Sequence, residues 1–445
     1  MATECHTQLG FSFQPKIVLD FDGGEITTDT GLLLLREFDK QLGLTKALRG
    51  LYNDWRNPLL IEHETHEMLC QRLYQIGAGY EDCDDADTLR TDPTLTTVVG
   101  RTEALASQPT LSRLENHADW ATIGRLRDLS LRWFLKHGYR KKEVPEEILL
   151  DSDATNDPCH GQQELAFFHG KYNQHMYHPL FFFEGHTGAL LSARLRPGNS
   201  HSSAETTREL RRLVPILRER FGKSQLSYRA DAASAMPEIY QTLEALKVRY
   251  AIGIASNAVF KRKSARWIER AQRKYARTQE AVRRFYGFRH RARSWRKNRR
   301  VVVKIEVGPL GSNVRFVVTN RSGKPQEVFQ WYDHRGECEN YIKEFKRDLL
   351  GDRLSCHAYR ANALRLQLHG LAYQLLALFR RHALRLTKLC RARIETIRLR
   401  LFKVGARFKR TARRLWFHLS SSWPGRHLFA QVCREIARIP QSVPT

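Results

Sequence analysis

The segment from residue 147 to residue 255 constrains the fold most strongly, because short apolar runs of strand length alternate in it with stretches of helical period. Three strands come first and are followed in turn by a helix, a strand, a second helix and a last strand. The predicted strands are 148–153, 179–183, 189–195, 225–230 and 250–255, and the predicted helices are 204–221 and 236–246. This order predicts an α/β fold.

The order of these elements is consistent with a ribonuclease-H-like sheet, and the flanking sequence divides the chain around it. Residues 1–145 carry apolar residues at helical intervals, so we expect a helical N-terminal region. Residues 146–385 are expected to form the α/β domain. Residues 386–445 are strongly basic and are predicted to be helical, including the runs 391–400 and 403–414.

The charge of the chain points to a polyanionic partner. The 445 residues carry a formal net charge of +27, which favours nucleic acid or an anionic membrane surface. The longest apolar stretch, residues 371–379, is too short to span a bilayer, so we expect no membrane insertion. No basic segment followed by an apolar run opens the chain, and the eight cysteines form no Cys-x-x-Cys pair. We therefore expect a cytoplasmic protein with reduced thiols.

The most basic part of the chain is residues 261–300, where seventeen lysines and arginines stand against Glu269 and Glu280. Aromatic residues are interleaved with these cations. We expect the segment to follow a DNA backbone, with Trp295 or Trp267 stacking on a base extruded near a cleavage site. Alternatively, Trp267 packs on the core side of an Arg-rich helix.

Four residues further along the chain share one predicted helix face. Arg335, Glu339 and Lys346 are separated by four and seven residues, and Tyr332 lies one turn before Arg335. A carboxylate flanked by cations suits a nuclease helix that binds metal and phosphate. The alternative is a solvated helix with salt bridges between neighbouring turns.

Two strand ends supply further carboxylates. Asp151 and Asp153 come at the end of one apolar strand, and Asp231 closes the strand 225–230. Carboxylates at these positions are commonly presented into active sites of open α/β sheets, although single acidic residues there more often cap a helix. Together with Glu339, they can hold a pair of Mg²⁺ ions, which prefer hard oxygen ligands.

Three motifs resemble those of a known family. Asp153-Ala-Thr155, Tyr228-Arg-Ala-Asp231 and Tyr332-x2-Arg335-x3-Glu339-x6-Lys346 are similar to the motifs of DDE transposases from bacterial insertion sequences, in the group marked by a Tyr-Arg-Glu-Lys signature. The stretches 79–82, 157–163 and 177–181 resemble the branch called the insertion sequence 1380 family, so the likeness covers nearly the whole chain.

Two further strands, 301–307 and 313–320, are predicted after the basic segment. The resemblance implies that residues 1–145 form a DNA-binding region and that residues 146–385 form the catalytic domain, a ribonuclease-H-like core with a strand-containing insertion at about 257–325. It also implies a catalytic, metal-binding triad of Asp153, Asp231 and Glu339. It implies two Mg²⁺ ions, for which Mn²⁺ can substitute. Tyr332, Arg335 and Lys346 would contact phosphates of the transposon end. Asp151 remains an alternative first ligand, although Asp153 is favoured because a small residue and Thr155 follow it.

The implied activity is cleavage of insertion-sequence ends and their joining to target DNA. The partners would be double-stranded DNA, as terminal inverted repeats and target, and a second copy of the chain in a homodimer on DNA at the bacterial nucleoid. Two alternatives remain: a ribonuclease-H-like endonuclease without strand joining, and a non-enzymatic DNA-architectural protein. The second alternative explains the charge but not the ordered carboxylates.

Overall fold

The computed structural model describes residues 9–140 and 143–440, which form two compact units. One unit contains the described residues up to Thr122, together with Asp348–Leu350 and the residues from Leu375 onward. The other contains Ile123–Arg347 and Gly351–Gln374. Residues from both ends of the chain thus group in the first unit, and the second unit begins at Ile123.

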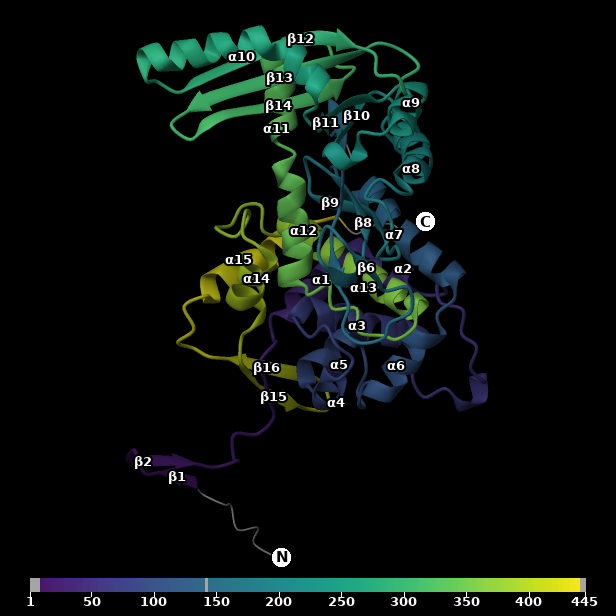
Figure 1. Ribbon diagram of the computed structural model, residues 1–445. Coiled ribbons are helices and arrows are strands. Elements are labelled where there is room, and N and C mark those ends of the chain that lie inside the picture. Colours follow the sequence, from purple (N-terminus) through teal and green to yellow (C-terminus); the bar gives the residue numbers. More distant parts are fainter. Residues whose placement is uncertain (1–8, 141–142, 441–445) are drawn as a thin grey trace, which may run out of the picture. The chain divides into compact units, whose positions relative to one another are not determined.

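The second unit is built on a mixed eight-stranded sheet with the order β12-β13-β14-β11-β10-β4-β8-β9 (Figure 1). Strand β10 runs parallel to β4 and to β11, and the other neighbouring strands pair antiparallel. The strands are β4 (Glu147–Ala154), β8 (Leu180–Glu184), β9 (Ala189–Arg194), β10 (Gln225–Ala230), β11 (Arg249–Ile254), β12 (Val282–His290), β13 (Arg299–Gly308) and β14 (Gly311–Thr319). The five strands predicted between residues 147 and 255 are confirmed as β4, β8, β9, β10 and β11.

Helices cover the two faces of this sheet according to the period-two alternation of the strands. On β4 and β10, Leu150 and Tyr228 point into the main core, where α8 (Thr206–Arg220) and α9 (Pro237–Ala245) contribute Leu213 and Leu243. The opposite face carries Ala251, Val302 and Val317, against which α11 (Pro325–Asp333) packs. This second face also presents Asp151 of β4 and Arg229 of β10, which contacts α11.

The predicted insertion does not form a sheet of its own. It contains α10 (Ala258–Thr278) and the strands β12, β13 and β14, which continue the central sheet beyond β11 (Figure 1). The sequence predicted β13 and β14 but not β12, whose exposed Arg283, Arg284 and Arg289 look like part of a basic run. Backbone pairing with β13 along its whole length makes this run a strand.

The helix expected to carry Tyr332 through Lys346 is two helices, α11 and α12 (Gly336–Asp348). At the junction the amide of Arg335 donates to the carbonyl of Tyr332, and the amide of Cys338 donates to Arg335. These three-residue spacings replace the four-residue spacing of an α-helix, and glycine at 336 weakens helical continuity. Tyr332 therefore lies before the break, Arg335 within it, and Glu339 and Lys346 after it.

Other elements complete the second unit. A small sheet in the order β5-β7-β6 lies in the chain between β4 and β8, and a short turn of helix follows β10. The bounds of these elements are β5 (Asp157–Pro158), β6 (Phe167–His169), β7 (Gln174–Tyr177) and η2 (Ala232–Ser234). Two long helices, α7 (Trp120–His137) and α13 (Tyr359–His382), contain residues of both units.

The first unit is helical over most of residues 32–117, as predicted. Its helices there are α1 (Leu32–Leu42), α2 (Leu44–Ala47), η1 (Pro58–Leu60), α3 (Thr65–Ala78), α4 (Asp85–Leu89), α5 (Pro93–Val99) and α6 (Gln108–His117). The short strands β1 (Leu9–Phe11) and β2 (Gln14–Leu19) pair with each other.

The C-terminal part of the first unit corrects the prediction of an entirely helical region. It contains α14 (Ile394–Ile397), η3 (Arg398–Phe402) and α15 (Arg426–Ala437), but also β15 (Ala406–Arg410) and β16 (Leu415–Leu419). Strand β15 pairs with β16 and with β3 (Ile26–Thr27). Ala406 and Phe408 are buried while Arg407 and Lys409 are exposed, so this basic run alternates with the period of a strand.

No helix of the described residues is long and apolar enough to cross a bilayer.

Candidate active site

The site lies at the carboxyl ends of the parallel strands β4 and β10. Asp153 is the penultimate residue of β4, and Asp231 directly follows β10, one position beyond the pair Ala230–Ser152. Glu339 comes from α12. These three carboxylates line one pocket of about 200 Å³, which Arg335 also lines. Parallel strands place their carboxyl ends at the same sheet edge, which explains why residues so distant in sequence meet here.

The pocket concentrates negative charge. Burial, together with the neighbouring charges of Asp231 and Glu339, raises the pKa of Asp153 to about 7, although Arg335 opposes the shift. The folded protein therefore disfavours ionisation of this carboxyl group even with Arg335 beside it.

Arg335 is the cation in direct contact with Asp153. One guanidinium nitrogen lies 3.3 Å from Asp153 Oδ2 and another lies 2.5 Å from Glu339 Oε1, so Arg335 bridges two of the three carboxylates. Burial alone would lower the pKa of Arg335, but the charges of Asp153 and Glu339 raise it above its usual value. Among residues 9–140 and 143–440, no three His, Cys, Asp or Glu side chains are close enough together to hold a metal ion as they stand. The donor chemistry nevertheless fits a hard divalent cation, because all three groups are carboxylates and two of them already bind the guanidinium of Arg335.

Comparison with known proteins identifies the family. Residues 9–441 match the profile of the family described as Transposase DDE domain group 1. The chain belongs to this family of DDE transposases. No curated protein matches the chain.

Two solved transposase structures are similar to this chain. A piggyBac transposase synaptic complex with hairpin DNA aligns over 94% of this chain and 87% of its own, at 11% identity and a TM-score of 0.41. A Mos1 transposase paired-end complex with left transposon end aligns over 50% of this chain and 68% of its own, at 12% identity and a TM-score of 0.18.

Asp151, the alternative first ligand, lies outside the pocket of the transposase. It is fully buried and accepts two hydrogen bonds from Arg229, at 2.8 Å to Oδ1 and 2.6 Å to Oδ2. Burial raises the pKa of Asp151 to about 6, although Arg229 opposes this. Arg229 also donates to the carbonyl of Trp331, at 2.8 Å. The pair Asp151–Arg229 therefore ties β4 and β10 to the end of α11.

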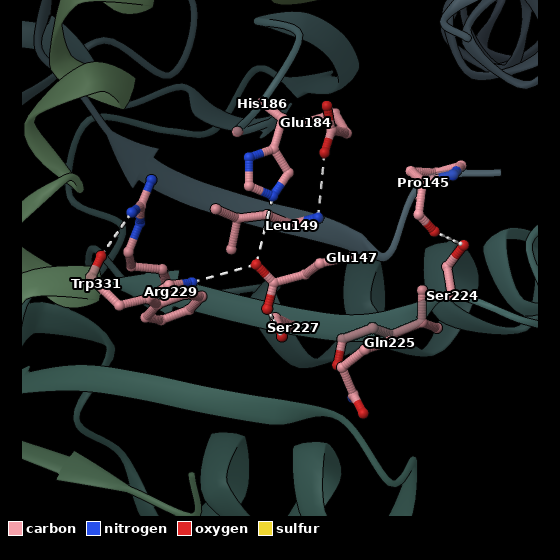
Figure 2. Close-up of polar contacts among 12 residues, drawn as sticks. Pro145, Glu147, Leu149, Glu184, His186, Ser224, Gln225, Ser227, Arg229 and Trp331 are labelled. Atoms are coloured by element: carbon pink, nitrogen blue, oxygen red, sulfur yellow. Dashed lines mark hydrogen bonds and ion pairs between the residues drawn. The ribbon is translucent and has the colours of Figure 1, made fainter. Parts of the chain in front are cut away.

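A second polar cluster, which the sequence analysis missed, fixes the same helix. Figure 2 shows Glu147 between Ser227 and His186, with Trp331 nearby. Glu147 accepts hydrogen bonds from Ser227 at 2.6 Å, from Arg321 at 2.9 Å and from the indole of Trp331 at 3.2 Å. Burial would raise the pKa of Glu147, but these donors and His186 hold it well below its usual range. Trp331 is thereby fixed immediately before Tyr332.

Two members of the Tyr-Arg-Glu-Lys signature are held by protein groups. Tyr332 lies against β11 at Gly253, where an added Cβ would lie 2.4 Å from the Tyr332 hydroxyl. The ammonium of Lys346 donates to the carbonyl of Asn156 at 2.7 Å and pairs with Asp352 at 3.3 Å. Lys346 also lines a second hollow, which shares Asp153 and Glu339 with the first pocket.

The position of Trp295 does not agree with the expectation that it stacks on an extruded base. Its side chain is only 5% exposed and belongs to the main core. Its ring packs edge-on against Tyr240, with centroids 5.6 Å apart, and Arg299 lies over it at 5.3 Å. An aromatic residue within a basic run can thus be a core residue whose neighbours alone are exposed.

Trp267 packs against the main core, as the alternative interpretation predicted. It is half-buried and stacks on Tyr286 of β12, with centroids 4.7 Å apart and planes 5° from parallel. Beside this pair, α10 and β12 line a wide groove of about 1050 Å³. The cations of this groove, which we call the α10–β12 groove, are Arg266, Arg270, Arg273, Lys274, Arg277 and Arg284.

Proposed function

We propose that this transposase cleaves DNA at insertion-sequence ends and joins the resulting 3′ hydroxyls to target DNA. The observation that carries the proposal is the meeting of Asp153, Asp231 and Glu339 in one pocket of a DDE transposase. Water would be the nucleophile for cleavage and the DNA hydroxyl the nucleophile for joining. The ordering of the carboxylates supports an enzyme over a purely architectural DNA-binding protein.

Asp153, Asp231 and Glu339 would hold two Mg²⁺ ions, for which Mn²⁺ can substitute. When bound, these ions would activate the attacking oxygen and stabilise the leaving oxygen. The guanidinium of Arg335 must first release Asp153 and Glu339, and a DNA phosphate offers it a replacement anion in the same bidentate manner. In this proposal Arg335, Tyr332 and Lys346 position the phosphates of the transposon end.

The partners in this proposal are the double-stranded terminal inverted repeats and the target DNA, bound by a homodimer. The α10–β12 groove would follow a DNA backbone, because its six cations line one continuous hollow and phosphate contacts dominate DNA affinity. We also propose membership of the insertion sequence 1380 family, on the sequence stretches quoted above, and action at the bacterial nucleoid.

The test uses labelled duplexes that carry the inverted repeats flanking the gene, incubated with plasmid DNA and Mg²⁺. We expect nicked ends and label covalently joined to the plasmid. Nicked ends without joined label would favour the endonuclease alternative. Asp231→Asn and Glu339→Gln should abolish both products while retaining DNA binding in gel-shift assays. Variants that cleave as well as the wild type would overturn the triad assignment.

A further inference from the structure

Two hollows of the second unit meet at the pair Asp153 and Glu339. The first is the pocket of about 200 Å³ described above, and Lys171, Tyr172 and Ser202 form part of its wall. The second has a volume of about 340 Å³ and is lined by cations of α12. Asp153, Ala154 and Glu339 line both hollows, so the two adjoin at these residues, and we call them together the depression.

The cations of the second hollow lie on the helix face that carries Glu339. Lys343 and Arg347 follow Glu339 by four and eight residues, so they project from successive turns of the same side of α12. Both are exposed, and neither forms an ion pair with any described residue, unlike Lys346 beside them. Lys343 and Arg347 are therefore the cations of this hollow that are available to an external anion.

The first hollow has an available cation on its other wall. Lys171 lies in a tight turn between β6 and β7, in which the amides of Tyr172 and Asn173 both donate to the carbonyl of His169. Asn173 adopts a left-handed conformation with φ of +53°, which closes the turn. Lys171 is exposed and has no ion pair within the described chain; its ammonium lies 5.4 Å from the ring centroid of Tyr172.

We propose that one DNA strand crosses this depression, with the phosphate to be cut at Asp153 and Glu339. Phosphates on one side of the cut would contact Lys343 and Arg347, and phosphates on the other side would contact Lys171. A polyanion that passes over three carboxylates is repelled there, so cations on both sides are needed to hold the strand in register. The inference rests on the proposed function and adds to it a strand path and three phosphate-contacting residues.

The test measures binding of a duplex that carries the inverted repeat and its flanking DNA, with single phosphates replaced by neutral methylphosphonates. The variants are Lys171→Gln and the double variant Lys343→Gln/Arg347→Gln. Lys223→Gln is the matched control, because Lys223 is exposed and precedes β10 at the end of the strand opposite Asp231. Each lost phosphate contact should make the salt dependence of log K shallower by about 1.

We expect DNA binding by Lys171→Gln to lose its sensitivity to methylphosphonates on one side of the cut only. Binding by the double variant should lose its sensitivity on the other side only. The control should respond as the wild type does. The strand path would be wrong if the binding losses from substitution and from phosphate neutralisation added at every position. It would also be wrong if both variants lost their sensitivity on the same side of the cut. If the wild type neither cuts nor joins the unmodified duplex in Mg²⁺, the proposed function itself fails and the strand path fails with it.

Discussion

At the residue scale, the two aspartates of β4 have opposite surroundings although they lie on the same face of one strand. Asp151 is paired with the buried guanidinium of Arg229, whereas Asp153 faces other carboxylates in the pocket. Removing the charge of Asp151 should therefore lower the free energy of unfolding, and removing the charge of Asp153 should not.

Asp151→Asn should lower the free energy of unfolding by about 3–5 kcal/mol, because it leaves the buried charge of Arg229 uncompensated. Asp153→Asn should leave the free energy of unfolding unchanged or raise it near neutral pH, since Asp153 adjoins two other carboxylates and Arg335 keeps its contact with Glu339. Urea unfolding of both variants measures this. A stable Asp151→Asn beside an unstable Asp153→Asn would contradict the assignment of roles.

Arg335 should compete with divalent metal for the same carboxylates. Without DNA, Arg335→Gln should bind Mn²⁺ roughly tenfold more tightly than the wild type, because a cation in contact with Asp153 and Glu339 is removed. Isothermal titration with Mn²⁺ gives the affinity, and Arg284→Gln, an exposed site on β12, is the control. Equal or weaker binding by Arg335→Gln would show that the guanidinium does not compete with metal.

At the scale of elements, the close packing of α11 against β11 depends on the absence of a side chain at Gly253. Gly253→Ala would place a methyl group 2.4 Å from the Tyr332 hydroxyl and 3.2 Å from the Ala232 amide nitrogen. We expect a loss of about 1–3 kcal/mol in stability, as for other overpacked sites, and weaker binding of the transposon end. Thermal unfolding and gel shifts measure the two effects.

Gly308→Ala is the matched control for this substitution. Gly308 also lies in a strand of the same sheet, but an added Cβ there meets no atom within 4 Å. If both substitutions had the same small effect, the contact between Tyr332 and β11 would not constrain the helix junction.

The elements around the site were predictable where their apolar pattern is strong. β4 and β11 contain the apolar runs 148–150 and 250–254, and β10 alternates the apolar Leu226, Tyr228 and Ala230 with polar residues, as a strand does. The break between α11 and α12 was missed because Arg335 and Glu339 keep a helical spacing across it. β15 was missed because its charged residues suggested a basic helix, whereas tertiary pairing with β3 and β16 decides its conformation.

At the scale of the whole chain, the contacts between distant segments could not be predicted from the sequence. Nothing local indicates that Lys171 lines the pocket of Asp153, or that Trp331 binds Glu147 across 184 positions. The order of the carboxylates along the chain did indicate their meeting, because carboxyl ends of adjacent parallel strands share an edge. Sequence therefore predicted the candidate triad but not the residues that position it.

Asp153, Asp231 and Glu339 are proposed to act together as one metal-binding catalytic centre. A metal-specificity switch in end cleavage tests this proposal. Glu339→Cys and Asp231→Cys should be inactive in Mg²⁺ and regain cleavage in Mn²⁺ or Cd²⁺, because a thiolate ligand favours softer metals. Asp151→Cys should show no such switch. If neither cysteine variant regains cleavage in any softer metal while the wild type cleaves in Mn²⁺, these carboxylates do not bind the catalytic metal.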